Sequence, residues 1–561
     1  MKKAYRFLCI VLVMMLAWNL AACSKSTKKS NKPSAGKFSD SAGNSGSDKT
    51  AEGKKKISPR KNKLPITTEN IKLVLYDGFP TGARQIYSSM AETDIVKKMM
   101  KETGLQLEFV HAPEGDDGTF FNTMIASESL PDILRDGFGS YPGGPMAAMD
   151  DGILLDATDL IDKYAYYYNG ILDQGGPELR RRVMSDDGRY KLFGVTFLPE
   201  YLDGVRHGGF LTRQDLLDKV GITKLPVTME EYEKMFDAYL GLDITPWAVA
   251  LSEWQFNDYA PVASAYGVRY SGFQLRDGKV TYSRCLPEYK DFLKKMAEWV
   301  KKGYISSDAF NQKAADAGKS FQAGTAGAVL SGSWENITRE SVGKVSDPSF
   351  EIVGLALPRL KEDDMLTTFS AVLSNPEMAP RYISAGCKHP EEAVRFVDYL
   401  YKQETMKMTA WGVNTKEHTL WKDNPDGSRS WTDFMVKNPE VDYETMRQRY
   451  TFNPMQGMWD TEMEKLQYEI PQVQQPWSVW SYNTDDSDVI PKYVTRTAEE
   501  ERELNTLMDE IDTYSGEMVQ KFISGQEPLD HFDNFVKQLE KLGIERACEI
   551  HQQAYERYLD R

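Results

Sequence analysis

The sequence predicts an α/β protein whose chain folds into two lobes. From residue 64 onward, short β-like runs alternate with longer segments of helical periodicity, which is the pattern of α/β architecture. The chain has 561 residues, of which 41% are hydrophobic and 27% are charged. This composition is typical of a folded globular protein and excludes a wholly disordered, collagenous or polytopic membrane chain. The length leaves room for about two to four domains, each with its own core.

The N-terminal residues have the pattern of a secretory signal. Lys2 and Lys3 precede an apolar run over residues 7–20, which is shorter than the roughly 20 residues that a membrane-spanning helix needs. The run ends in Leu20-Ala21-Ala22-Cys23, which resembles the bacterial lipobox, whose cysteine is lipidated and begins the mature chain. We therefore expect a signal peptide over residues 1–22 and an acyl anchor on Cys23 at the extracellular face of the cytoplasmic membrane. Cleavage by ordinary signal peptidase, with Cys23 incidental, is the alternative.

Residues 23–63 are expected to be the lipidated cysteine followed by a disordered tether. The segment is rich in Ser, Lys, Gly, Asn and Pro, has Phe38 as its one aromatic residue, and carries far more basic than acidic side chains. A segment of this composition cannot bury enough apolar surface to fold. We expect it to hold the folded body away from the membrane.

The elements of the body are predicted from hydrophobic periodicity. Residues 93–103 have apolar side chains at helical spacing and end at Gly104, a typical helix C-cap. Strands are predicted over residues 71–76, 105–110 and 350–357, a further helix over residues 390–402, and a largely helical tail after residue 498. This order indicates that the chain crosses between the lobes more than once. The expected lobes are residues 64–190 with 347–405, and residues 191–346 with 406–561.

Charge and motif content exclude several functional classes. The formal charge of −15 argues against nucleic acid as a partner. The sequence contains no HExxH, GxSxG or GxGxxG motif, and its six histidines are scattered. Gly318-Lys319-Ser320 resembles the end of a phosphate loop, but Lys313 stands where the first glycine of that loop belongs. The 83 acidic residues do not single out a pair of carboxylates for glycoside hydrolysis, so an enzyme is not expected.

The cysteines and the acidic run at residues 485–488 predict neither a metal site nor a cofactor. Removal of the signal takes Cys9, lipidation uses Cys23, and the remaining three are Cys285, Cys387 and Cys548, with no CxxC pair. The sequence allows one disulfide among these three cysteines. The alternative is that all three are buried structural thiols. The run Asp485-Asp486-Ser487-Asp488 lacks the rest of a twelve-residue calcium loop, so we expect a solvated turn; a structural calcium ion has no clear motif to support it.

Several segments, in one order behind the lipobox, resemble the extracellular solute-binding lipoproteins of oligosaccharide ABC transporters. The likeness is to the large Gram-positive branch of family 1, the LipO/LplA-like group. Leu130-Pro131-Asp132-Ile133 is similar to the family's "lPDi" stretch, and Asp187-Gly188-Arg189-Tyr190 to its "DGk-lY" stretch. Leu216 replaces a tryptophan of the family pattern, and residues 410–485 form an aromatic-rich insertion. Further matching segments are residues 152–164, 211–221, 226–232, 303–308, 318–333, 389–393, 522–525, 542–544 and 554–555.

The resemblance implies a two-lobed periplasmic-binding-protein-like fold of type II. Each lobe would hold a mixed sheet flanked by helices, with a hinge between the lobes and a helix-rich C-terminal part. It implies an oligosaccharide or related polar solute bound in the cleft between the lobes, without chemistry, and delivered to two permease subunits. The ATPase would be a separate cytoplasmic subunit, and the binding protein a monomer. A surface glycan-binding adhesin without transport and a carbohydrate-active enzyme are the alternatives.

A cleft for sugar rings needs flat aromatic faces together with carboxylate, amide and guanidinium groups. Within the expected loops, these residue types give a set of candidate ligand contacts. They are Arg84, Tyr141, Trp254, Trp334, Glu335, Trp459, Asp460, Trp477 and Trp480. The alternative for each aromatic residue is a core anchor, because most tryptophans in a domain of this size are at least half-buried. Arg213 and Asp215 are expected to form a structural pair.

Overall fold

The structure is a computed structural model. It describes residues 61, 63–127, 130–135, 137–194, 208–259, 261–367, 380–441, 443–451, 457–458, 471–491 and 494–560. The signal peptide and nearly all of the tether lie outside the described residues, so the expectations for residues 1–60 are not addressed by the fold. Within the described residues, no helix is both long enough and apolar enough to cross a bilayer.

The described strands form two four-stranded sheets and three two-stranded ribbons. The strands of the first sheet are β1 (Lys72–Tyr76), β2 (Gln106–Val110), β3 (Ile133–Arg135) and β11 (Arg381–Ile383). Those of the second sheet are β4 (Gly208–Arg213), β5 (Thr245–Ala248), β8 (Ala326–Gly332) and β9 (Ile352–Leu355). The ribbons pair β6 (Phe273–Arg276) with β7 (Lys279–Tyr282), β10 (Leu366–Thr367) with β14 (Thr484–Asp485), and β12 (Trp421–Asp423) with β13 (Arg429–Trp431).

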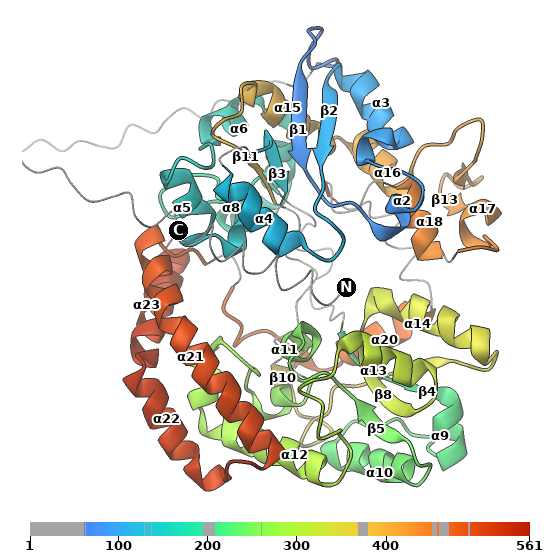
Figure 1. Ribbon diagram of the computed structural model, residues 1–561, viewed down its shortest axis with the longest axis vertical. Coiled ribbons are helices and arrows are strands. Elements are labelled where there is room, and N and C mark those ends of the chain that lie inside the picture. Colours follow the sequence, from blue (N-terminus) through green and yellow to red (C-terminus); the bar gives the residue numbers. More distant parts are fainter. Residues whose placement is uncertain are drawn as a thin grey trace, which may run out of the picture. The chain divides into compact units, whose positions relative to one another are not determined.

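Helices surround both sheets (Figure 1). Those that precede β4 in the chain are α2 (Thr81–Arg84), η1 (Met90–Glu92), α3 (Asp94–Thr103), α4 (Asp117–Ala126), η2 (Phe138–Ser140), α5 (Gly144–Asp150), α6 (Thr158–Tyr164), α7 (Tyr166–Gln174) and α8 (Gly176–Val183). Those between β4 and β9 are α9 (Gln214–Val220), α10 (Met229–Leu240), α11 (Trp254–Tyr259), η4 (Ala263–Tyr266), η5 (Ser283–Cys285), α12 (Pro287–Lys301), α13 (Ala314–Gln322) and α14 (Ser333–Ser346). The remaining ones are α15 (Pro390–Leu400), α16 (Gln403–Trp411), α17 (Asp433–Val436), α18 (Tyr443–Tyr450), α20 (Pro471–Trp480), α21 (Ala498–Ser524), η7 (Leu529–His531), α22 (Phe532–Lys541) and α23 (Ile544–Leu559).

The first sheet has the order β11-β3-β1-β2, with β1, β2 and β3 parallel and β11 antiparallel. The predicted strands at residues 71–76 and 105–110 are confirmed as β1 and β2. The predicted helix is confirmed as α3, where the Thr93 hydroxyl accepts a hydrogen bond from the Val96 N–H and Gly104 ends the helix at φ +78°. A Cβ at Gly104 would lie 2.1 Å from the Thr67 carbonyl oxygen, so this close turn requires glycine.

The second sheet has the order β5-β8-β4-β9 and is covered on both faces, since every residue of β4 and β8 is buried. Its core includes the fully buried rings of Trp247 and Trp299. The strand predicted near residue 350 is β9, and it pairs with β4 in this sheet. The expected division, which assigned residues 347–405 to the first lobe, therefore differs from the structure at β9. Periodicity identifies a buried strand but does not reveal which sheet accepts it.

The aromatic-rich insertion also packs differently from the expected division, which placed residues 406–561 in the second lobe. Met408 and Met458 belong to the hydrophobic cluster of the first sheet. Helix α18 contacts α2, where the Gln448 side-chain oxygen accepts a hydrogen bond of 2.8 Å from the Gly82 N–H. Helix α18 thus extends the part of the molecule built on the first sheet, whereas α20 of the same insertion packs on β4 and β9 of the second sheet.

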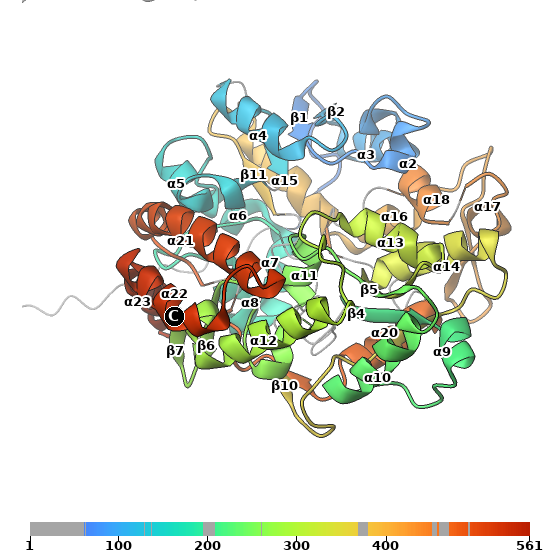
Figure 2. The same ribbon diagram turned by 60° about the horizontal axis from the view of Figure 1, so that its bottom comes forward.

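The C-terminal helices α21, α22 and α23 pack on the part built around the second sheet (Figure 2). Helix α21 begins with a capping box in which Thr497 and Glu500 exchange hydrogen bonds with each other's backbone N–H groups. Its buried side chains include Ile511, Val519 and Phe522. The predicted helical tail is therefore confirmed.

We expect the free energy of unfolding of the variant Glu231→Gln to fall less at acid pH than that of the wild type. In the capping box of α10, Glu231 accepts hydrogen bonds from the Val227 and Thr228 N–H groups. Burial opposes ionisation, but these bonds and Lys224 outweigh it and lower the pKa of Glu231 from 4.5 to about 2. A lowered pKa stabilises the fold above pH 4.5, and this contribution is lost as the pH falls toward 2.

Urea unfolding measured from pH 7 to pH 2 tests this expectation. The wild-type free energy of unfolding should fall more steeply below pH 4.5 than that of the variant. Glu230→Gln is the matched control, because Glu230 pairs with Lys234 at an exposed position of the same helix. Equal slopes for the wild type and Glu231→Gln would contradict the role given to this carboxylate.

Candidate functional site

Charged side chains gather at the carboxyl edge of the first sheet. Asp77 directly follows β1, Arg135 ends the parallel strand β3, and Arg381 begins the antiparallel strand β11. Arg381 stands opposite Arg135 in the register, so all three residues meet at the same edge. In open α/β sheets this is the edge at which ligands bind.

These three residues form a buried ion cluster. Asp77 accepts hydrogen bonds from Arg135 Nη1 at 3.0 Å and from Arg381 Nη2 at 3.3 Å, with the Gly78 N–H a third donor at 2.7 Å. The side chains of Asp77 and Arg381 are 2% and 1% exposed. Within the described part of the chain, Arg135 Nε and Arg381 Nη1 are buried without a hydrogen-bond partner. Burial lowers the pKa of Arg381, and Asp77 opposes this effect.

Arg84 connects the loops that follow β1 and β2 by hydrogen bonds. Its guanidinium donates to the carbonyl oxygens of Phe79 and Ala112 and lies 4.7 Å from the centre of the Phe79 ring. The Phe79 ring stacks on His111 at 4.5 Å. His111 Nε2 accepts from the Met90 N–H, so Nδ1 carries the proton and donates to the Asp77 carbonyl. Arg84 thus holds the edge in shape, and ligand contact by Arg84 stays a prediction.

A pocket of about 220 Å³ lies beside η2 and α5, which follow β3. Its lining includes Gly139, Lys191 and Tyr382, together with Arg496 and Glu501 near the start of α21. Tyr141 lies next to η2, and its hydroxyl donates to Asp151 at 3.1 Å. The structure therefore places Tyr141 near this pocket with its hydroxyl already engaged.

The second sheet carries two of the predicted aromatic residues beyond its own carboxyl edge. Strands β5 and β8 are parallel, and they are followed by α11, which begins at Trp254, and by α14, which contains Trp334. Helix α11 lies close over the first residue of β4, since a Cβ at Gly208 would fall 1.9 Å from the Tyr259 ring. The topology brings the helices of Trp254 and Trp334 to one edge. Their side chains are outside what the structure describes.

Of the other predicted ligand contacts, three are described by the structure, and each of them is partly or fully engaged within the protein. Glu335 receives a hydrogen bond of 2.8 Å from Arg339, one helical turn along α14. Trp477 is 7% exposed, and Trp480 is fully buried, with its indole N–H donated to the Phe210 carbonyl at 3.1 Å. These two tryptophans therefore pack as core anchors of the second sheet, the alternative that the sequence also allowed. Trp459 and Asp460 lie outside the described residues.

The structure also describes the charged pair and the acidic segment that the sequence singled out. Arg213 and Asp215 form a salt bridge with Nε–Oδ1 at 2.8 Å, and Asp347 lies 3.2 Å from the same guanidinium, which confirms the structural pair. Asp485 accepts hydrogen bonds from the N–H and hydroxyl of Ser487, as in a solvent-side turn. Among the described residues, no group of three or more His, Cys, Asp or Glu side chains has metal-binding geometry.

Sequence reasoning did not single out Asp77, Arg135 and Arg381. Asp77 directly follows the strand predicted over residues 71–76, and the neighbouring residues do not indicate which distant side chains it pairs with. A charged residue at the end of an apolar run was the one available signal, as in Ile133-Leu134-Arg135. Such residues are buried only when they are paired.

A family model of bacterial extracellular solute-binding proteins matches residues 94–414. The fructooligosaccharide ABC transporter substrate-binding protein FusA of Streptococcus pneumoniae is 25% identical over 233 residues. This match spans 38% of the present chain and 42% of that relative, so it covers less than half of either sequence. The fold of the whole chain is therefore compared with solved structures.

Solved structures extend the likeness over most of the chain. The crystal structure of alginate-binding protein AlgQ2 without calcium ion has a TM-score of 0.68 at 20% identity, covering 88% of this chain and 99% of that one. The S. pneumoniae FusA structure in complex with kestose has a TM-score of 0.69 at 17% identity, covering 87% and 99%. At these identities the likeness establishes the fold. It is the expected two-lobed periplasmic-binding-protein-like fold of type II.

We expect Asp77→Asn to destabilise the protein by about 3–5 kcal/mol, because it removes the counter-charge of the buried Arg381 guanidinium and of the largely buried Arg135 guanidinium. Urea unfolding at pH 7 measures the loss. Glu108→Gln is the matched control, since it removes an exposed ion pair with Lys72 from the same sheet and should cost far less stability. A loss for Asp77→Asn no larger than that of the control would show that the cluster does not stabilise this edge.

Proposed function

Because this chain belongs to the family of bacterial extracellular solute-binding proteins, we propose that it is the lipid-anchored binding component of an ABC importer for an oligosaccharide. It binds the sugar between its two lobes and delivers it to the permease. The observation that carries this proposal is the family match over residues 94–414. The family and the structural neighbours are binding proteins rather than enzymes. In this role the protein changes the position of its ligand and none of its bonds.

The ligand class is proposed from the relatives. FusA is described as binding fructooligosaccharide, and its structures include complexes with kestose and fructo-nystose. A solute-binding protein from Bifidobacterium longum infantis that binds human milk oligosaccharides has a TM-score of 0.68 to this chain. An oligosaccharide is therefore the ligand class that these proteins support, and the particular sugar and linkage are left to experiment.

The binding residues are proposed to lie at the two sheet edges. Trp254 and Trp334 follow parallel strands of the second sheet, so their helices begin at one edge. Aromatic rings stack on the apolar faces of sugars, and expulsion of water from both surfaces drives the contact. At the first sheet, the cluster of Asp77, Arg135 and Arg381 holds the backbone that surrounds the binding edge. In this proposal the first edge supplies a rigid frame and the second edge supplies stacking surfaces.

The anchor is proposed from the N-terminal sequence alone. Leu20-Ala21-Ala22-Cys23 supplies the acceptor cysteine, and the basic segment after it supplies the tether. Each buried methylene of an acyl chain contributes about 0.8 kcal/mol of membrane binding, so two or three chains on Cys23 hold the protein firmly at the surface. A tethered binding protein stays near its permease subunits, which raises its effective concentration there.

Isothermal titration calorimetry of the purified protein against fructooligosaccharides, milk-type oligosaccharides and uronate oligosaccharides tests the ligand. We expect one of these classes to bind and to raise the Tm. Trp254→Ala and Trp334→Ala should each weaken binding about five- to tenfold, the value of an aromatic contact of about 1 kcal/mol. Tyr166→Ala, at an exposed tyrosine of α7, is the control and should bind normally. Absence of binding to every oligosaccharide would refute the proposed ligand class.

Metabolic labelling with an alkyne fatty acid tests the anchor. The wild-type chain, expressed in a bacterial host that processes lipoproteins, should incorporate the label, and Cys23→Ser should not. Cys9→Ser is the matched control. Cleavage of the signal peptide removes residue 9 from the mature chain, so this variant should still incorporate the label. Label on the Cys23→Ser variant would exclude Cys23 as the acylated residue.

A further inference from the structure

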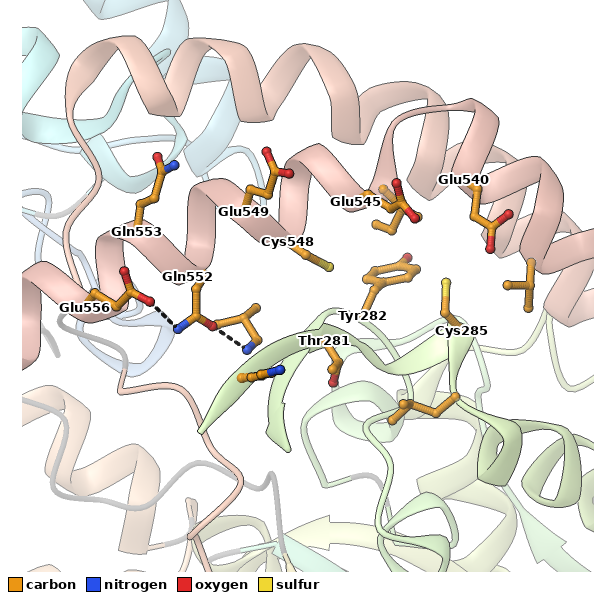
Figure 3. Close-up of a pocket in the computed structure, with 15 residues that line it drawn as sticks. Thr281, Tyr282, Cys285, Glu540, Glu545, Cys548, Glu549, Gln552, Gln553 and Glu556 are labelled. Atoms are coloured by element: carbon orange, nitrogen blue, oxygen red, sulfur yellow. Dashed lines mark hydrogen bonds between the residues drawn. The ribbon is translucent and has the colours of Figure 1, made fainter. Parts of the chain in front are cut away.

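A groove of about 750 Å³ lies between the β6–β7 hairpin and the helices α22 and α23 (Figure 3). Val280 and Tyr282 contribute one wall, and Val536 and Ile544 the other. The hairpin is fixed to α23 by a hydrogen bond of 2.8 Å from the Val280 N–H to the Gln552 side chain. The groove is thus a feature of the second part of the molecule, separate from the sheet edges described above.

Two cysteines from distant parts of the sequence open onto this groove. Cys285 ends the 3-10 helix η5 that follows β7, and Cys548 lies in the first turns of α23. Figure 3 shows their thiols on either side of the Tyr282 ring, both inside the groove. Each side chain is partly exposed, and neither is in a disulfide. Both thiols are therefore accessible to a reagent in the groove.

The local backbone brings the two cysteines to the same place. The Cys548 sulfur receives a hydrogen bond from the backbone N–H of Tyr282. Tyr282 is the N-cap of η5, and Cys285 stands one turn later. The contact with Tyr282 therefore places Cys548 beside the start of the short helix that carries Cys285, and Cys548 lies near enough to contribute to the raised pKa of Cys285.

We propose that Cys285 and Cys548 are a cross-linking site that joins α23 to the β6–β7 hairpin through an intramolecular disulfide. The reaction is thiol–disulfide exchange with an external disulfide. One cysteine thiolate attacks that disulfide and releases one thiol, and the second cysteine then attacks the mixed disulfide and releases the other. The two cysteines lose two protons and two electrons, and the external disulfide is reduced to two thiols. The product is a single new S–S bond.

The groove controls the rate of this exchange through the thiolate fraction. Burial, the neighbouring Cys548 and Glu540 raise the pKa of Cys285 to about 12. Burial raises the pKa of Cys548 to about 11, although the Tyr282 N–H opposes this. Charged groups around the groove are Lys279 on β7 and Glu540, Glu545, Glu549 and Glu556 on α22 and α23. Both thiols are thus neutral at pH 7, and the cross-link should form about tenfold faster for each pH unit from 7 to 9.

The cross-link would hold a helix that also contacts the first part of the molecule. Arg557, near the end of α23, forms a salt bridge of 3.0 Å with Asp186, and Arg181 lies 5.7 Å from the centre of the Tyr558 ring. A disulfide at Cys548 fixes the beginning of the same helix to the hairpin. Since it joins residues far apart in the sequence, it also restricts the unfolded chain and stabilises the fold.

Oxidised glutathione at pH 7, 8 and 9, followed by alkylation under denaturing conditions and peptide mapping, tests the proposal on the full chain. We expect a linked peptide pair containing Cys285 and Cys548, formed faster at each higher pH, while Cys387 stays outside the link. The cross-linked protein should unfold at a higher Tm, and dithiothreitol should reverse the change. Cys387→Ser is the matched control and should cross-link at the wild-type rate.

The single variant Cys285→Ser sharpens the test. In that variant Cys548 should retain one glutathione, because the second thiol that resolves the mixed disulfide is missing. The proposal is overturned if wild-type Cys285 and Cys548 each retain glutathione without a linked peptide, since their thiols then do not meet. It is also overturned if both remain free at pH 9, or if the link that forms contains Cys387.

Discussion

A single buried carboxylate, that of Asp77, joins three strands of the first sheet. It binds one arginine from β3 and one from β11, two strands that are far apart in the sequence. Removing two cations and one anion from water is costly, and only close pairing offsets this cost. The carboxyl edge therefore tolerates little rearrangement, and Arg84 and His111 extend the same rigidity to the neighbouring loops.

The second sheet holds its edge by a different physical means. Glycines let aromatic rings lie directly on the strands, since a Cβ at Gly209 would fall 2.6 Å from the Trp480 ring and one at Gly327 would fall 2.2 Å from the Tyr239 ring. Here close packing replaces ion pairing. The helices that carry Trp254 and Trp334 follow strands whose positions are set by this packing. Ion pairing thus holds the carboxyl edge of the first sheet, and close aromatic packing holds the strands of the second sheet.

Local patterns in the sequence predicted the local structure well. The strand at β1 and the helix α3 with its Gly104 cap follow from periodicity and capping, which depend on neighbouring residues. The placement of β9 and of the insertion around α18 did not follow, because the choice of sheet depends on contacts between residues far apart in the sequence. The Asp77 cluster was missed for the same reason. The resemblance to a family supplied the fold, and no sequence rule separated Trp480, a core residue, from aromatic residues at an edge.

The links between the two parts of the molecule differ in kind from the links within each. The hydrophobic clusters of the two sheets are separate. Between the C-terminal helices and the part built on the first sheet, the contacts include the salt bridges of Arg557 with Asp186 and of Arg502 with Asp151. Exposed ion pairs are individually weak and exchange readily with water, whereas an apolar core resists separation. Relative motion is the default expectation for domains joined in this way. A fold that closes over a ligand by a hinge needs this combination of firm interiors and exchangeable polar contacts.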